Sequence, residues 1–234
     1  MDKEKLVSVI LSTYNSEETL EDSINSILNQ TYLDIEILIM DDGSEDNTPN
    51  ILERISGSHQ SLKIYRNKTN IGLTRSLNVL IDKSNGKYIA RQDADDISHP
   101  ERIRIQIDEI EKNNLDFCSS RAFVKDSNRK IPGLSFFLPK KIMMKYKNPF
   151  IHGTLVIKKN ILKDVGKYDE NFYYSQDYKL MKDLINYKCN YKILKTPLYT
   201  LNTKNNISTK KLDEQDYYAE CVRKNIIPKI WNYI

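Results

Sequence analysis

The chain has 234 residues and a mass of 27.4 kDa, which is enough for a sizeable hydrophobic core and excludes a miniprotein held together by disulfides. Lys and Arg outnumber Asp and Glu by 36 to 32, and 39% of the residues are hydrophobic, a globular rather than a disordered composition. A net charge of +4 does not call for a nucleic-acid partner.

Neither a membrane span nor a leader peptide is predicted. The longest uninterrupted apolar run is residues 37–40, whereas a span needs roughly 20 apolar residues. The chain starts with Met1 and runs through charged residues directly into a strand-like segment. We therefore expect a cytoplasmic protein. Cys118, Cys189 and Cys221 form no Cys-x-x-Cys motif, so reduced thiols are expected rather than disulfides or a zinc site.

The first ~115 residues alternate short β-branched segments with segments of helical periodicity, which is typical of a parallel sheet with crossover helices. Strands are predicted at residues 6–12, 35–40, 62–65 and 87–91. Asn15 and Glu18 resemble a capping box at the start of the first helix, and Pro100 marks the start of the fourth. The inner faces of the four helices are Leu20, Ile24, Ile27 and Leu28; Ile51, Leu52 and Ile55; Leu73, Leu77, Leu80 and Ile81; and Ile103, Ile107 and Ile110.

After residue 115 the alternation fades. Residues 125–135 are predicted to be an exposed loop, residues 154–158 a strand and residues 178–187 a helix. No linker divides the chain, so we expect one α/β domain over residues 1–203 and a helical tail over residues 204–234.

The tail has an apolar stripe with basic residues beside it. This pattern favours packing on the domain, with contact to an anionic membrane as the alternative. The stripe is Tyr218, Val222, Ile226, Ile230 and Ile234, and the basic residues are Lys211, Arg223, Lys224 and Lys229.

The glycines exclude two kinds of nucleotide site. No two of the seven glycines lie closer than 13 positions apart, so neither G-x-G-x-x-G nor a P-loop occurs. If a nucleotide binds, its phosphates need another partner, such as a divalent metal held by carboxylates.

An acidic cluster, Asp93, Asp95 and Asp96, follows the fourth predicted strand at the edge where open α/β sheets bind ligands. An EF-hand would require Gly and Glu where Ser98 and Arg104 stand, and a haloacid dehalogenase-type phosphatase would require Thr where Ile97 stands. Metal-mediated binding of a diphosphate remains, with helix capping as the structural alternative.

A second acidic strand end is formed by Asp41, Asp42, Gly43 and Ser44. These residues could end the strand and cap the next helix, or one carboxylate could accept a hydrogen bond from uracil N3–H. Together with the polar end of the first strand, residues 12–15, the two acidic ends converge on one sheet edge. Such convergence favours a ligand site over capping alone.

Four segments in this order and spacing resemble the family 2 glycosyltransferases with a GT-A fold. They are residues 7–15 (VSVILSTYN), 39–48 (IMDDGSEDNT), 70–78 (NIGLTRSLN) and 93–96 (DADD). The resemblance covers about residues 5–200. It implies an α/β GT-A domain with a mixed sheet, and an inverting enzyme that uses a nucleotide sugar, usually a UDP-sugar, with Mn²⁺ or Mg²⁺.

The resemblance also implies roles for individual residues. Tyr14 would pack on the base, Asp42 would bind uracil N3, and Arg75 would lie near the nucleotide. Asp95 would bind the metal, and Asp93 would face the ribose and donor sugar. Thr13 and Ala94 belong to the same predicted donor site.

The segments that resemble the family's acceptor-binding side match its pattern less well. The family's base is usually written Glu-Asp at the start of a late helix, and this chain has Gln176-Asp177, so Asp177 is the predicted base and Gln176 a departure. Helix capping is the alternative for Asp177. His152 would touch the acceptor or a phosphate, or be a satisfied polar residue.

The chain has no Gln-x-x-Arg-Trp motif of processive members, which implies addition of a single sugar. The implied acceptor is a glycan or a lipid-linked saccharide, in bacterial surface-polysaccharide synthesis. The alternatives are a sugar nucleotidyltransferase, which would carry a glycine-rich N-terminal loop, and a non-catalytic module that binds a nucleotide sugar or glycan.

Overall fold

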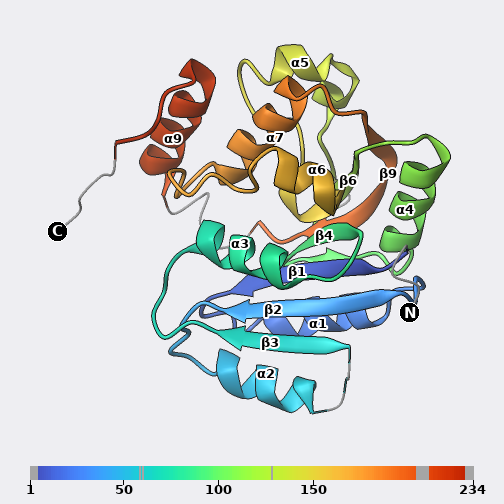
Figure 1. Cartoon of the computed structure of the whole chain (residues 1–234), viewed down its shortest axis with the longest axis vertical. Coiled ribbons are helices and arrows are strands. Elements are labelled where there is room, and N and C mark those ends of the chain that lie inside the picture. Colours follow the sequence, from blue (N-terminus) through green and yellow to red (C-terminus); the bar gives the residue numbers. More distant parts are fainter. Residues whose placement is uncertain (1–4, 58, 60, 128, 204–210, 230–234) are drawn as a thin grey trace.

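The computed structural model describes residues 5–57, 59, 61–127, 129–203 and 211–229. Its centre is a nine-stranded mixed sheet in the order β3-β2-β1-β4-β8-β6-β9-β5, with β7 paired to β6 (Figure 1). The strands are β1 (Val7–Thr13), β2 (Ile35–Asp41), β3 (Leu62–Arg66), β4 (Tyr88–Asp93), β5 (Ile97–Ser98), β6 (Phe117–Val124), β7 (Lys130–Ile131), β8 (Val156–Lys158) and β9 (Tyr191–Leu201).

Helices cover both faces of the sheet. They are α1 (Leu20–Leu28), α2 (Thr48–Ser56), α3 (Leu73–Lys83), α4 (Arg102–Lys112), α5 (Lys140–Met143), α6 (Lys159–Asp164), α7 (Gln176–Asn186) and α9 (Leu212–Lys224). Two 3-10 turns, η1 (Leu134–Phe137) and η2 (His152–Thr154), lie in the second half. No helix in the described ranges is long and apolar enough to cross a membrane.

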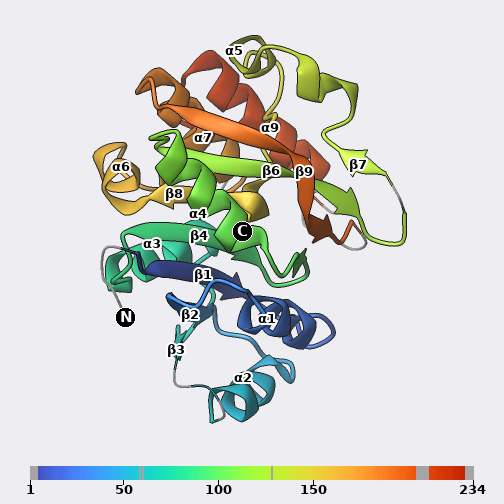
Figure 2. The same cartoon turned by 90° about the vertical axis from the view of Figure 1, so that its right-hand side faces the viewer.

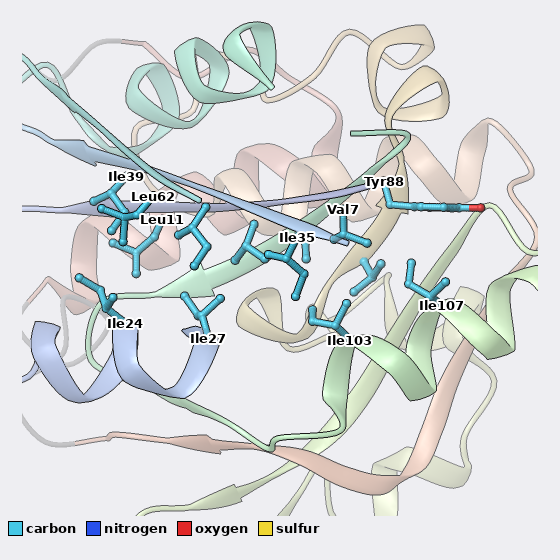
Figure 3. Packing of buried hydrophobic residues seen from close by; sticks show 14 of the residues in the cluster. Val7, Leu11, Ile24, Ile27, Ile35, Ile39, Leu62, Tyr88, Ile103 and Ile107 are labelled. Atoms are coloured by element: carbon cyan, nitrogen blue, oxygen red, sulfur yellow. The ribbon is translucent and has the colours of Figure 1, made fainter. Parts of the chain in front are cut away.

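The alternating side chains of β1 separate two cores. Val7, Val9 and Leu11 point to the layer of α1, α2 and α4, where they pack with residues such as Ile24 and Ile103 (Figure 3). Ile10 belongs to the opposite core, which α3, α6, α7 and α9 cover. Period-two alternation therefore buries both faces of the strand, as expected for parallel strands between helices.

The predicted first half is confirmed, with differences at the helix starts. The capping box is wrong: Asn15 has a positive φ of 49° in a turn, and α1 begins at Leu20. Pro100 precedes α4, which begins at Arg102. Ser44 does not cap a helix either, because α2 begins at Thr48.

The sequence interpretation missed β6 and β9. β6 buries Ser119 and Ser120, and β9 carries two lysines and Pro197, so neither has the apolar run or clean alternation that marks a strand. The predicted loop at 125–135 contains the short strand β7.

The tail helix α9 packs on the domain. Tyr218, Cys221 and Val222 are buried in the same core as residues of α7. Residues 204–210 and 230–234, which include two residues of the predicted stripe, lie outside the described residues. The three cysteines are free and buried, as expected.

Candidate functional site

The carboxyl ends of β1, β2 and β4 lie side by side. Thr13 pairs with Asp41 across β1 and β2, and Ser12 pairs with Asp93 across β1 and β4. From β1 the chain moves to β2 on one side, and later to β4 on the other. Because the connections leave in opposite directions, this edge is the topological switch point of the sheet, the place where ligands bind in open α/β sheets.

The loops after β1 and β2 are tied together. The Asn15 N–H donates to Ser44 Oγ at 3.0 Å, and Asn15 Oδ1 accepts from the Glu45 N–H at 2.9 Å. Tyr14 lies in this fixed loop with 45% of its surface exposed, which leaves its ring accessible for stacking on a planar ligand. The Thr13 hydroxyl beneath it is buried, and no described residue hydrogen-bonds it.

Asp42 organises the loop before α3. Its carboxylate accepts hydrogen bonds from Asn67 Nδ2 at 2.7 Å and from the N–H groups of Ile71 and Gly72 at 3.0 and 2.9 Å. A carboxylate offers about four acceptor positions, so one position remains for a ligand N–H. Only 2% of Asp42 is exposed. The structure thus gives Asp42 a structural function in addition to the predicted contact with a base.

The acidic cluster contains three carboxyl groups in different surroundings. Asp93 accepts from Arg91 Nη2 at 2.6 Å, and its N–H donates to the Tyr199 hydroxyl at 3.0 Å. Burial and the charge of Asp93 raise the pKa of Asp95 to about 6. Asp96 is buried, and accepts from the Asn202 N–H at 2.7 Å; burial raises its pKa well above its usual range. Asp96 therefore serves the fold, while Asp93 and Asp95 remain for a ligand.

Side chains beneath the cluster fix its backbone. Thr19 Oγ1 donates to the Ala94 carbonyl at 3.1 Å, and Ser23 Oγ to the Asp93 carbonyl at 2.7 Å. Gln92 Nε2 donates to the Asp96 carbonyl at 2.9 Å. These contacts satisfy the loop carbonyls and hold the carboxylates at the sheet edge.

The carboxylate oxygens of Asp93 and Asp95 are suitable ligands for a divalent cation. Mg²⁺ and Mn²⁺ prefer oxygen ligands, and Mg²⁺ is commonly held by one or two carboxylates together with water and substrate phosphates. In the described ranges no three His, Cys, Asp or Glu side chains gather as a complete metal site. The pair therefore suits an ion that shares its remaining ligands with a bound diphosphate.

The residues predicted for the acceptor side lie in η2 and in the first turn of α7. Asn148 Nδ2 donates to Asp177 Oδ2 at 2.8 Å. His152 Nε2 and the Tyr168 hydroxyl share a hydrogen bond at 2.7 Å. Gln176 is half-buried beside Asp177. Asp177 lies in the first turn of α7 and is not its N-cap residue, which is Ser175.

His152 connects the two sides electrostatically. Burial and then the positive charge of Arg91 lower the pKa of His152 below 6.5, whereas the charges of Asp93 and Asp177 act in the opposite direction. The same three charged groups act on the buried hydroxyl of Tyr168. The charges of Asp93 and Asp177 therefore both act on the buried His152 ring, whose neutral form is favoured by burial.

Gly153 brings η2 against the acidic cluster. A Cβ at this position would lie 2.7 Å from Asp93 Oδ2 and 2.5 Å from the Tyr199 hydroxyl, closer than real Cβ atoms approach. Arg102, fully buried, donates to the carbonyls of Gly153 at 2.7 Å and Arg91 at 3.0 Å. Only glycine allows this approach.

The segment before α7 packs on α3 and so joins the two sides. Thr74 Oγ1 donates to the Phe172 carbonyl at 3.0 Å, and Asn78 Nδ2 to the Tyr168 carbonyl at 2.9 Å. The exposed Arg75 lies 3.5 Å from Glu170 in the same segment. Arg75 is thus placed between the Asp42 loop and the acceptor side.

Sequence reasoning missed several residues of the site. Arg91 carried a signal, since this charged residue directly follows the apolar residues 88–90 of the predicted strand. Tyr168 and Tyr199 could not be distinguished among fifteen tyrosines, and Asn148 belongs to no recognised motif.

Solved structures of glycosyltransferases have the same fold as this chain. TarS of S. aureus, residues 1–349 in complex with UDP, superposes with a TM-score of 0.74 at 21% identity, covering 96% of this chain and 67% of that one. Another TarS structure contains UDP-GlcNAc. A mannosyltransferase from Pyrobaculum calidifontis, in complex with GDP-Man and Mn²⁺, superposes with a TM-score of 0.73 at 17% identity, covering 95% and 65% of the two chains.

Sequence relatives are also glycosyltransferases. The chain is 35% identical over 137 residues to the Escherichia coli UDP-Glc:alpha-D-GlcNAc-diphosphoundecaprenol beta-1,3-glucosyltransferase WfgD, covering 58% of this chain and 53% of WfgD. The chain spans about three fifths of the length of the curated relatives it matches most strongly. The sequence profile described as Glycosyl transferase family 2 matches residues 8–186. The chain therefore belongs to the family 2 glycosyltransferases and has their GT-A fold.

Proposed function

We propose that this domain is an inverting, metal-dependent transferase that moves one sugar from a UDP-sugar to a saccharide acceptor, free or lipid-linked. The observation that carries the proposal is the close packing of η2 on Asp93, where a Cβ at Gly153 would lie 2.7 Å from Asp93 Oδ2. This packing puts His152 of η2 near Asp93, and the charge of Asp177 acts on His152 as well. UDP and UDP-GlcNAc in TarS, and the donor named for WfgD, support a UDP-sugar.

The donor half is assigned to the loops at the sheet edge. Tyr14 stacks on the base, and the remaining acceptor position of Asp42 receives its N–H. Arg75 faces the nucleotide, Asp95 would hold Mn²⁺ or Mg²⁺, and Asp93 faces the ribose and the donor sugar. The bound ion would supply positive charge against the diphosphate that leaves. The buried Thr13 hydroxyl and the Ala94 turn complete the donor side.

The acceptor half is assigned to the first turn of α7. The acceptor oxygen forms a bond to the anomeric carbon as the bond from that carbon to the diphosphate oxygen breaks, so UDP departs with the electron pair. Asp177 takes the proton of the acceptor hydroxyl, and Asn148 holds the carboxylate in place at 2.8 Å. Neutral His152, hydrogen-bonded to Tyr168, lines the space between acceptor and donor beside Gln176.

The acceptor class rests on the relatives. WfgD is named for an acceptor that carries a diphosphoundecaprenol group, which supports a lipid-linked saccharide in surface-polysaccharide synthesis. The mannosyltransferase neighbour contains GDP-Man, so GDP-mannose belongs in a donor screen beside UDP-Glc, UDP-Gal and their N-acetyl forms.

The decisive test compares Asp177→Asn with Asp183→Asn, a substitution on the same helix away from the cluster. An asparagine at 177 can still accept from Asn148 but cannot take a proton. We expect unchanged metal-dependent donor binding by calorimetry and a fall in transfer of about 10²–10⁴-fold. Asp183→Asn should keep full activity.

If the Asp177→Asn enzyme were active, Asp177 would not be the catalytic base. Asp95→Ala should abolish metal-dependent donor binding itself. Donor binding by wild type without UDP release on adding any acceptor saccharide would favour a non-catalytic binding module.

A further inference from the structure

The segment between β7 and Asn148 exposes an unusual amount of apolar surface. Twelve large apolar side chains are exposed in the described ranges, and five of them fall within residues 129–147. Their exposed fractions run from 52% to 89%. They are Leu134, Phe137, Leu138, Ile142 and Tyr146. Such a concentration marks an interaction surface rather than scattered exposure.

The segment is built to present these side chains. Phe136 lies between the guanidinium of Arg121 and the ammonium group of Lys140, at 5.3 and 5.0 Å from its ring centroid. Arg121 Nε also donates to the Pro132 carbonyl at 3.1 Å, and Met143 and Met144 are buried. The exposed apolar residues therefore stand on an anchored scaffold.

The charge of the same segment has one sign. Residues 127–149 contain six cationic and no acidic side chains. The cations are Arg129, Lys130, Lys140, Lys141, Lys145 and Lys147. No ion pair joins any of these six to an acidic side chain of the described part of the chain. Elsewhere in the molecule, lysines and arginines commonly pair with acidic residues, as Lys167 does with Asp82.

The C-terminal helix extends this surface. Arg223 of α9 donates to the Tyr146 carbonyl at 3.4 Å, so the end of α9 adjoins the segment. Ile226 and Ile227, which follow the helix, are 51% and 72% exposed. Figures 1 and 2 place α5 and α9 at the same end of the molecule, away from α2 and β3.

We propose that residues 129–147 form a docking surface for an anionic lipid bilayer. Apolar side chains among lysines and arginines can enter the boundary between headgroups and acyl chains while the cations contact anionic headgroups. A second copy of the chain is disfavoured as the occupant, because a two-fold contact would place six cations against six others.

The surface ends where the acceptor side begins. Asn148, which hydrogen-bonds Asp177, follows directly after Lys147. If the proposed function holds, a docked domain would receive a lipid-linked acceptor from this side. Vesicle binding is measured without donor or acceptor, so its failure is distinguishable from failure of the transferase assignment.

The experiment measures sedimentation of the full chain with two kinds of vesicle, phosphatidylcholine alone and phosphatidylcholine mixed with phosphatidylglycerol. We expect binding only to the anionic vesicles, weakening as salt is added. Lys141→Gln with Lys145→Gln should lower the partition coefficient about tenfold or more, as should Phe137→Ser with Ile142→Ser. The matched controls Lys112→Gln and Leu33→Ser, exposed at other places, should bind as wild type does.

A second readout locates the contact. In a Trp231→Phe background, Phe137→Trp should show a blue shift of fluorescence on anionic vesicles, and Leu33→Trp should show none. The side chains changed at residues 33, 112, 137, 141, 142 and 145 are exposed, and circular dichroism checks the fold of every variant.

Three outcomes would overturn the proposal. They are absence of wild-type binding to anionic vesicles, unchanged binding by both double variants, and light scattering that shows a dimer lost in Phe137→Ser with Ile142→Ser. The last result would assign the surface to a second copy of the chain.

Discussion

Tyr199→Phe tests whether the long strand β9 supports the acidic loop. The Tyr199 side chain is 2% exposed, and its hydroxyl accepts from the Asp93 N–H at 3.0 Å. The hydroxyl also hydrogen-bonds Asp96. Removing one oxygen leaves the ring, and its contact with the Arg102 guanidinium at 5.3 Å, unchanged. The substitution therefore isolates the hydrogen bonds.

Both partners of the lost hydroxyl are left in a site largely shielded from water. Leaving a buried polar group unsatisfied costs about 1–3 kcal/mol. For a chain of this size, each kcal/mol lowers the melting temperature by about 2–4 °C, so we expect a fall of about 2–12 °C. Because Asp93 loses one of its main-chain hydrogen bonds, metal-dependent affinity for the donor should also fall by about threefold to tenfold, which corresponds to about 1 kcal/mol.

The assays are differential scanning calorimetry and titration of the donor nucleotide with Mn²⁺. Tyr187→Phe is the matched control, because Tyr187 at the end of α7 is 53% exposed. We expect no change in melting temperature or affinity for the control. If Tyr199→Phe melts within about 1 °C of wild type and binds donor equally well, β9 does not support the acidic loop in the way described.

Two further predictions concern stability. Burial opposes ionisation of Glu36, but hydrogen bonds from Ser8 and Asn85 outweigh it and lower its pKa to about 2, so its stabilisation is present above pH 4.5 and is lost as pH falls towards 2. Urea unfolding measures how much unfolding free energy each protein loses when the pH falls from 5 to 2. After allowance for screening, this loss should be about 1–3 kcal/mol smaller for Glu36→Gln than for wild type. Equal losses in the two proteins would contradict the assignment. Gly43→Ala should destabilise by about 1–3 kcal/mol, because φ is +79° and a Cβ would lie 2.8 Å from the Thr69 carbonyl carbon; a melting temperature equal to wild type would refute that strain.

Several features could be predicted from local pattern alone. The strands and helices of the first half each bury a regular apolar face, so periodicity located β1 to β4 and α1 to α4. Acidic residues at two strand ends predicted the ligand edge, because parallel strands end at the same edge of a sheet.

Other local predictions failed where a polar side chain had a distant partner. Asn15 resembled a helix cap, but its side chain binds the Glu45 N–H in the neighbouring loop. The buried serines of β6 disguise a central strand, because their hydroxyls find partners such as Thr154. A short stretch of sequence does not reveal a partner that lies 30 or more residues away.

What the sequence determined by itself is the alternation of strands and helices, the family motifs and the identity of the charged residues. Only the tertiary structure decided which of them meet. Asp93 and Tyr199 are 106 residues apart, and Asn148 and Asp177 are 29 apart. The physical reason is that periodicity reports which face of an element is buried, whereas the charges and hydrogen bonds of the site depend on how separate elements pack around His152.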